Sequence, residues 1–125
     1  MIPAQLTAEV EELRTEQHEI ELHNDRGGPV VIIKNYPVLP GFSATSTELL
    51  LRFPPSYPNG KPDMFWTSQT LVLKGGGVPK NADSIETIVG RQWRRFSWHI
   101  SAWNPGRDNL RTFLEFVNSR FAQAA

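Results

Sequence analysis

The hydrophobic residues near the start of the chain follow the period of an α-helix. Leu6, Val10 and Leu13 occur at positions i, i+4 and i+7, while glutamates occupy most of the opposite face. Pro3 suits the first helical turn, where its missing N–H is not needed. The pattern therefore predicts a short amphipathic helix over roughly residues 3–16.

After this segment the hydrophobic period changes to two, which is typical of half-buried strands. Ile20 and Leu22 alternate with polar residues, and a turn-rich cluster (NDRGGP) follows at 24–29. Further strands are predicted at 30–33 (VVII), at 45–53 (TSTELLLRF) and from 64 onward (MFW). Because short turns join these four strands, an antiparallel meander is the simplest topology.

The next part of the chain has no clear period between residues 71 and 92. Residues 90–103 are rich in tryptophan and arginine, and Trp93, Trp98 and Trp103 are spaced by five. Residues with this spacing cannot share one face of a helix or one side of a strand. We therefore expect an irregular segment wrapped over the core, with each indole ring in its own pocket.

A second amphipathic helix is predicted at the end of the chain. Its apolar stripe comprises Leu110, Phe113, Leu114, Val117 and Phe121. Asp108 is the expected N-cap, because its carboxylate can accept from free N–H groups and complements the helix dipole. The order of helix, four-stranded meander, irregular segment and helix predicts an α+β fold, with the helices on one face of the sheet.

Length and composition restrict the chemistry available to this protein. The chain has 125 residues and no cysteine. We expect one domain, spanning 1–125, that folds without a disulfide or a structural metal. The absence of cysteine excludes thiol catalysis, Cys-ligated zinc and iron–sulfur clusters. His18 and His23 lack metal-ligand spacing and His99 is remote, so no metal or other cofactor is expected.

The charges are unevenly distributed although the formal net charge is +0. Residues 1–25 hold seven acids against Arg14, and residues 91–120 hold six arginines against two acids. We expect the two ends to neutralise each other in the fold; the alternative is an acidic and a basic face for two partners. No apolar run approaches the roughly 20 residues of a membrane span, and the N-terminus lacks a signal-peptide pattern. A cytoplasmic protein without membrane contact is therefore expected.

Four prolines lie close together after the third predicted strand, in FPPSYPNGKP at 53–62. They predict a rigid turn, in which Tyr57 buries its ring and hydrogen-bonds through its hydroxyl. This segment resembles the PxxYPxxxP signature of the ubiquitin-conjugating (E2, UBC-like) fold. With GRQWRRFSWH at 90–99 and WNPGRDNL at 103–110, the sequence resembles prokaryotic E2 family E over roughly residues 10–122.

The resemblance also implies where the catalytic cysteine of an E2 enzyme would lie. In E2 enzymes it precedes the tryptophan of a Trp-Ser-Pro segment by eight residues. Trp103 begins the matching Trp-Asn-Pro here, and the residue eight positions before it is Arg95. The His-Pro-Asn triplet of the family is absent as well. An arginine stays protonated and is no nucleophile, so the usual thioester cycle is excluded.

Ser97 and His99 are the only candidates for replacing the thiol. In a strand-like conformation residues i and i+2 point the same way, so the imidazole can activate the hydroxyl. The sequence shows no third, orienting group and no oxyanion donors. The alternative is that Ser97 hydrogen-bonds to backbone and His99 packs beside Trp98.

The arginines and tryptophans of the 90–103 segment are candidates for partner binding, since both residue types are enriched in protein hot spots. The predicted contact residues are Arg91, Trp93, Arg94, Arg95, Trp98 and Trp103, together with Tyr57 in the proline turn. The same set can instead stabilise the fold by cation–π packing, or stack on nucleic acid. The neutral net charge favours a protein partner over nucleic acid.

The resemblance implies an E2-like component of a bacterial ubiquitin-like modification system. Its expected partners are a ubiquitin-like protein, an E1-like adenylating enzyme and a JAB-type metalloprotease. Without a cysteine, the expected role is a noncovalent scaffold rather than an enzyme. The alternatives are an ester-forming transfer enzyme that uses Ser97 and His99, and a nucleic-acid-binding module.

Overall fold

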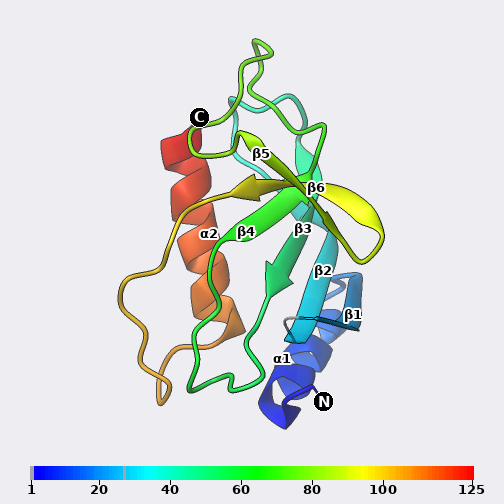
Figure 1. Cartoon of the computed structure of the whole chain (residues 1–125), viewed down its shortest axis with the longest axis vertical. Helices are drawn as coiled ribbons and strands as arrows, with labels where there is room; N and C mark the ends of the chain where they lie inside the picture. The colour runs from blue at the N-terminus through cyan, green and yellow to red at the C-terminus, as the bar shows by residue number, and fades with distance from the viewer. Residues whose placement is uncertain (1, 27) are drawn as a thin grey trace.

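The predicted order of helix, sheet and helix is confirmed in the computed structural model, which describes residues 2–26 and 28–125 (Figure 1). The elements are α1 (Ala4–Thr15), β1 (Ile20–Asp25), β2 (Gly28–Pro37), β3 (Ser46–Arg52), β4 (Phe65–Ser68), β5 (Ser84–Ile88), β6 (Arg91–Phe96) and α2 (Leu110–Ala124). Both helices and the strands β1 to β4 form close to their predicted positions. Gly27, in the predicted 24–29 turn, lies outside the described residues.

The sheet contains two strands more than the predicted meander. Its six antiparallel strands have the order β1-β2-β3-β4-β6-β5. The hydrophobic pattern misses β6 because Arg94 alternates with Arg91 and Arg95, so both faces of the strand carry charge. Backbone pairing with β4 on one side and β5 on the other holds this segment in the sheet. The irregular segment expected over 90–103 therefore begins only after Phe96.

Both helices pack on one face of the sheet and form the main core with it. Phe121 of α2 lies among rings from three other parts of the chain. Its ring centroid is 5.3 Å from Phe65 and 5.5 Å from both Phe96 and Phe42, each in an edge-on arrangement. Such aromatic pairs add to the stabilisation by buried area, so α2 is anchored at its C-terminal half.

The opposite face of the sheet carries a second, smaller apolar cluster. Its buried members are Val30, Ile32, Leu50, Trp66, Ile88 and Trp93. No helix covers this face within the described residues; long charged side chains lie over it instead. The guanidinium carbon of Arg91 lies 4.8 Å from the ring centroid of Trp93, and that of Arg52 lies 5.9 Å from Trp66. These cation–π contacts shield the two indoles from water.

An ion-pair network joins four strands, β1, β2, β3 and β6, on the same face. Lys34 Nζ lies 3.0 Å from Glu21 and 2.9 Å from Glu48, and Arg91 lies 3.2 Å from Glu48. Hydrogen bonds from His23 and Lys34 lower the pKa of Glu21 to about 2. Arg91 lies 3.7 Å from Glu21, so the network links an arginine of β6 to an acid of β1.

A second set of ion pairs joins the two helices. Arg111 of α2 pairs with Glu12 at 3.0 Å and also with Glu16, and both acids belong to the N-terminal part of the chain. Hydrogen bonds to these carboxylates raise the pKa of Arg111 above its ordinary value. Arg91 and Arg111, from the basic part of the chain, thus pair with glutamates of the acidic N-terminal part, as the charge distribution predicts.

The N-cap of α2 is Asn109, so the prediction that Asp108 caps this helix is wrong. The Asn109 side chain accepts from Thr112 N at 3.1 Å, and the Thr112 hydroxyl accepts from Asn109 N at 2.8 Å. This reciprocal pair is a capping box. Asp108 instead accepts from Asn104 N at 2.7 Å and closes the turn that precedes the helix.

Candidate functional site

The proline turn is anchored through Tyr57, as its sequence predicts. The Tyr57 ring packs edge-on against Phe53 at 4.8 Å, and its hydroxyl donates to Glu9 Oε1 of α1 at 2.5 Å. Burial raises the pKa of the Tyr57 hydroxyl well above its ordinary value, and the adjacent Glu9 carboxylate raises it further. Tyr57 is only 3% exposed, so it shapes the turn from inside and presents no surface to a partner.

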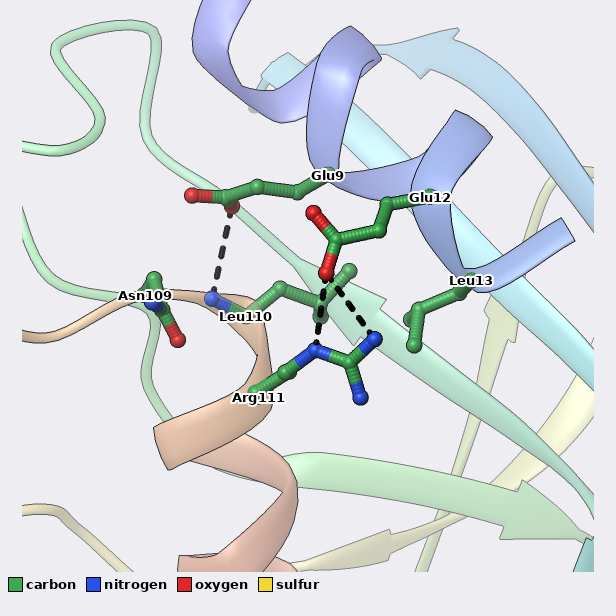
Figure 2. Close-up of a pocket in the computed structure, with 6 residues that line it drawn as sticks. All are labelled: Glu9, Glu12, Leu13, Asn109, Leu110 and Arg111. Carbon is green, nitrogen blue, oxygen red and sulfur yellow. Dashed lines mark hydrogen bonds and ion pairs between the residues drawn. The ribbon is translucent and has the colours of Figure 1, made fainter. Parts of the chain in front are cut away.

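The same glutamate also contacts the start of α2. Figure 2 shows Glu9 reaching the backbone N–H of Leu110, which donates to Glu9 Oε1 at 3.3 Å. The cavity beside it has a volume of about 50 Å³. A space of this size holds little more than a water molecule. This place is therefore a junction of α1, α2 and the proline turn rather than a ligand site.

Arg95 occupies the place that the resemblance assigns to the E2 cysteine, and its guanidinium is held by neighbouring strands. Its Nη1 donates to Glu86 of β5 at 2.8 Å, and its Nε donates to Ser97 Oγ at 3.0 Å. Glu86 also accepts from the Trp66 indole N–H at 2.7 Å. Arg95 is thus a positioned cation within a hydrogen-bond network.

Ser97 and His99 are not brought together by a strand. The segment 97–100 has no regular structure, and Trp98 N donates to Phe96 O at 2.9 Å in a tight turn. The strand-like conformation on which the pairing of Ser97 with His99 depends is therefore not present at 97–100. Within the part of the chain that the structure describes, no hydrogen bond joins Ser97 to His99.

His99 does have the orienting partner that the sequence did not reveal. Its Nδ1 lies 2.9 Å from both carboxylate oxygens of Asp63, which precedes β4. A carboxylate on Nδ1 leaves Nε2 as the nitrogen that can exchange a proton with a substrate or a hydroxyl. His99 and Asp63 are both accessible, so this pair lies at the surface.

The three tryptophans of the 90–103 segment occupy separate places, as their spacing predicts. Trp93 is 1% exposed on the outer face of the sheet, where its indole N–H donates to Ile88 O at 3.0 Å. Trp98 lies under Arg120 of α2, with 5.3 Å between the guanidinium carbon and the ring centroid. Trp103 donates to Pro58 O at 2.8 Å. Only Trp98 and Trp103 keep part of their surface exposed.

The arginines predicted to bind a partner make bonds within the chain. Arg94 donates to Ala82 O at 2.6 Å and to Gln69 O at 3.0 Å, which fastens two loops to β6. Arg91 and Arg95 are tied into the networks described above, although Arg91 stays exposed. Arg91 makes the cation–π contact that the alternative interpretation expects. Arg94 instead donates to backbone carbonyls.

An open groove of about 370 Å³ adjoins the Arg95 network. It is lined by Arg52, Phe53, Pro54, Lys61, Asp63, Met64, Trp66 and Glu86. Two of its acids already have partners, since Asp63 pairs with His99 and Glu86 with Arg95. Its cationic residues are less fully neutralised: Arg52 lies 3.7 Å from Asp25, and Lys61 donates at 2.7 Å to an uncharged partner, Ile100 O. The groove can therefore accept a carboxylate.

The sequence pattern does not reveal the groove, because four elements of the chain contribute to its lining. Strands β3 and β4, the proline turn and β5 all contribute, and none of them carries a recognisable motif for it. Only the register that pairs Trp66 with Arg95 and Arg95 with Ser84 brings these side chains together.

The described part of the chain contains no metal-binding cluster and no helix that could span a membrane. No group of three or more His, Cys, Asp or Glu side chains there can hold a metal ion. His23 pairs with Glu21 at 3.0 Å. Neither α1 nor α2 is long and apolar enough to cross a membrane.

Comparison of the chain with known proteins finds one matching family. The model of the family described as prokaryotic E2 family E matches residues 6–124. No curated protein and no solved structure matches the chain. The matched range includes the proline turn, the Arg95 network and both helices.

Proposed function

This chain belongs to prokaryotic E2 family E, and from that membership we propose that it is a noncovalent scaffold in a bacterial ubiquitin-like modification system. It holds a ubiquitin-like protein, or the E1-like enzyme that activates it, in an arrangement that favours transfer. A JAB-type metalloprotease is the third proposed member of the system. The catalytic thiol of such a system then belongs to another protein.

The state of Arg95 is the observation that carries this proposal. At the place of the E2 cysteine stands a cation bonded to Glu86 and Ser97, and the chain contains no thiol. A guanidinium in this position can bind a carboxylate or the carbonyl oxygens of a peptide, but it cannot accept an acyl group.

The proposed contact surface is the groove beside Arg95 together with the exposed parts of the 97–103 segment. The C-terminal carboxylate of a ubiquitin-like protein fits the groove chemically, because Arg52 and Lys61 are its cations and both its acids are paired. Arg95 borders this region, and Trp98 and Trp103 belong to the 97–103 segment; Arg91 lies at the other end of β6, opposite Ile88. Trp93, Arg94 and Tyr57 are proposed to support it from within, since their polar groups bond inside the fold.

The test is a titration of the purified chain with the candidate ubiquitin-like protein and, separately, with the E1-like enzyme. We expect saturable binding to one of them and a loss of about tenfold in Arg52→Glu/Lys61→Glu, which reverses the charge of the groove. Lys74→Glu is the matched control, since Lys74 is an exposed cation on the 71–77 loop. Absence of binding to both proteins overturns the proposal.

A second candidate function is favoured by the Asp63–His99 pair. In this reaction Ser97 Oγ attacks the thioester carbonyl of the activated ubiquitin-like protein, its proton passes to His99 Nε2, and the E1 thiol leaves. The product is an ester on Ser97. Its formation requires the Ser97 O–H to come within reach of His99 Nε2. The present bond, in which Ser97 Oγ accepts from Arg95 Nε at 3.0 Å, leaves this O–H free to donate.

The adduct distinguishes the two functions. E1-like enzyme, ubiquitin-like protein and ATP are mixed with the chain, and the mass of the chain is measured before and after hydroxide treatment. A hydroxide-labile adduct that is lost in Ser97→Ala establishes the ester. An unmodified mass in the presence of charged E1 leaves the scaffold as the function.

A further inference from the structure

Strand β5 forms one border of the sheet. It pairs with β6 from Ser84 opposite Arg95 to Ile88 opposite Arg91, and it has no strand on its other side. In an antiparallel pair, alternate residues point their N–H and C=O groups away from the neighbouring strand. Within the described residues, the backbone groups of Ser84–Ile88 make no hydrogen bond to backbone outside the ladder with β6. The outer edge of β5 can therefore pair with another extended chain.

The edge lacks the features that usually prevent such pairing. Proteins protect exposed edges with proline, lysine, bulges or a covering loop. The β5 sequence SIETI contains neither proline nor lysine, and its pairing with β6 is continuous. Ile85 is 42% exposed, one of only three large hydrophobic residues so exposed in the described chain. The strand thus presents both unpaired backbone and an apolar side chain.

The two faces of β5 differ in chemistry. Ser84 and Glu86 lie on the face of Trp93 and Arg95, whereas Ile85 and Thr87 point to the opposite face. Residues 83–88 include Asp83 and Glu86 but no base. A second copy of β5 brings no basic side chain to face Asp83, which is exposed and makes no ion pair within the described residues. A segment that alternates apolar and basic side chains complements both faces.

We infer that β5 binds an extended segment of the partner, with alternating apolar and basic residues, as a seventh strand of the sheet. The apolar side chains pack beside Ile85. The basic side chains lie on the other face, where the Glu86 side chain keeps 36% exposure beside its pair with Arg95, and near Asp83 at the end of the strand. This mode of binding is β-augmentation, in which backbone hydrogen bonds supply affinity and side chains supply specificity. The inference rests on the proposed scaffold function, because the segment is assigned to the ubiquitin-like protein.

The position of β5 connects this edge to the Arg95 network. The added strand would lie two strand spacings, about 10 Å, from β6. Ser84 is the register partner of Arg95, so the end of the added strand beside Ser84 would lie near Arg95 and Ser97. A partner segment held on β5 is thus presented to the region where E2 chemistry takes place.

The first experiment uses two pentapeptides that match the length of β5. Acetyl-Arg-Val-Arg-Val-Arg-amide, which places its valines opposite Ile85 and Thr87, is expected to bind the full chain and to slow amide hydrogen exchange in residues 84–88. Acetyl-Glu-Val-Glu-Val-Glu-amide is the charge-reversed control and is expected to bind at least about fivefold more weakly. Equal binding of both peptides, or no protection in 84–88, overturns the inference.

The second experiment uses two variants with matched exposure. Ile85→Lys places a protecting charge on the edge, and Leu39→Lys makes a comparable change at a side chain that is 40% exposed in the loop after β2. We expect Ile85→Lys to weaken the basic peptide and the ubiquitin-like protein by about fivefold or more, and Leu39→Lys to leave both unchanged. Circular dichroism melting confirms that each variant is folded.

The outcomes separate this inference from the proposed function. If the ubiquitin-like protein binds wild type and Ile85→Lys equally, the β5 edge is not used and the scaffold function stands. If the E1-like enzyme binds the wild-type chain and the ubiquitin-like protein does not, the scaffold function is retained with the enzyme as its partner. The inference that β5 binds the ubiquitin-like protein is then wrong. If the chain forms a dimer that Ile85→Lys abolishes, the edge pairs with a second copy and the inference is wrong.

Discussion

Tyr57 donates its hydroxyl to Glu9 at 2.5 Å, across a sequence separation of 48 residues. This bond joins the proline turn to α1, and Glu9 also accepts from the first residue of α2. Three separate parts of the chain therefore depend on one carboxylate. The wall of the candidate site on the side of the proline turn is set by this bond.

We expect Tyr57→Phe to lower the free energy of unfolding by about 1–3 kcal/mol, because it removes the donor from a partly buried carboxylate. Tyr36→Phe is the control: Tyr36 donates to Asn118 at 2.6 Å, and the exposed amide can bond to water instead. Its expected loss is smaller, about 0.5–1.5 kcal/mol. Urea unfolding of both variants measures the difference, and equal losses contradict the role given to Glu9.

We expect the free energy of unfolding to decrease at low pH, because Glu21 loses its charge there. Its pKa in the folded chain is about 2, below the ordinary value of 4.5, so its ion pairs stabilise the fold fully above pH 4.5. This contribution is lost as the pH decreases through 4.5 toward 2. Because the pair is partly exposed, salt is expected to reduce the effect. The thermal midpoints of wild type and Glu21→Gln should converge as the pH is lowered from 6 to 3.

We expect Asn109→Ala to destabilise the protein by about 1 kcal/mol, since the capping box of α2 is lost. Asp108→Ala removes the neighbouring acid, which the sequence pattern favours as the cap, and leaves the box intact. Hydrogen exchange at the start of α2 distinguishes them. Faster exchange of Thr112 N–H in Asn109→Ala alone supports the assignment, and the reverse result contradicts it.

We expect Phe121→Ala to cost about 3–5 kcal/mol, because it leaves a cavity between α2 and the sheet. Its ring contacts Phe42, Phe65 and Phe96, so the space cannot be filled by one neighbour. Phe116→Ala, at a half-buried ring on the same helix, is the matched control with a smaller expected loss. Denaturant titration measures both, and a larger loss for Phe116→Ala is the contrary result.

The prediction of the fold succeeds where the hydrophobic pattern is local. Leu6, Val10 and Leu13 define α1 because only the helical period places them on one face, and all three are buried. The pattern fails at β6, because its charged residues take part in cation–π, ion-pair and carbonyl contacts on both faces of the strand. An arginine on each face hides the alternation on which strand prediction relies.

Of the candidate site, the sequence predicts the residue types but not their roles. Arg94 is predicted as a contact residue, yet it bonds to the carbonyls of Ala82 and Gln69. Asp63 is not predicted at all, although it lies 2.9 Å from His99. Both relationships join residues at least 12 positions apart, and no short-range spacing encodes them.

The sequence by itself determined the two helices, the first four strands, the absence of a thiol and the resemblance to an E2 family. These follow from composition and from patterns within a few residues, where backbone geometry links spacing to structure. The tertiary structure alone decided what surrounds Arg95, which partner orients His99, and that β5 has an open edge. Those features depend on the register of strands distant in sequence, because a shift of one residue would turn every side chain to the other face of the sheet.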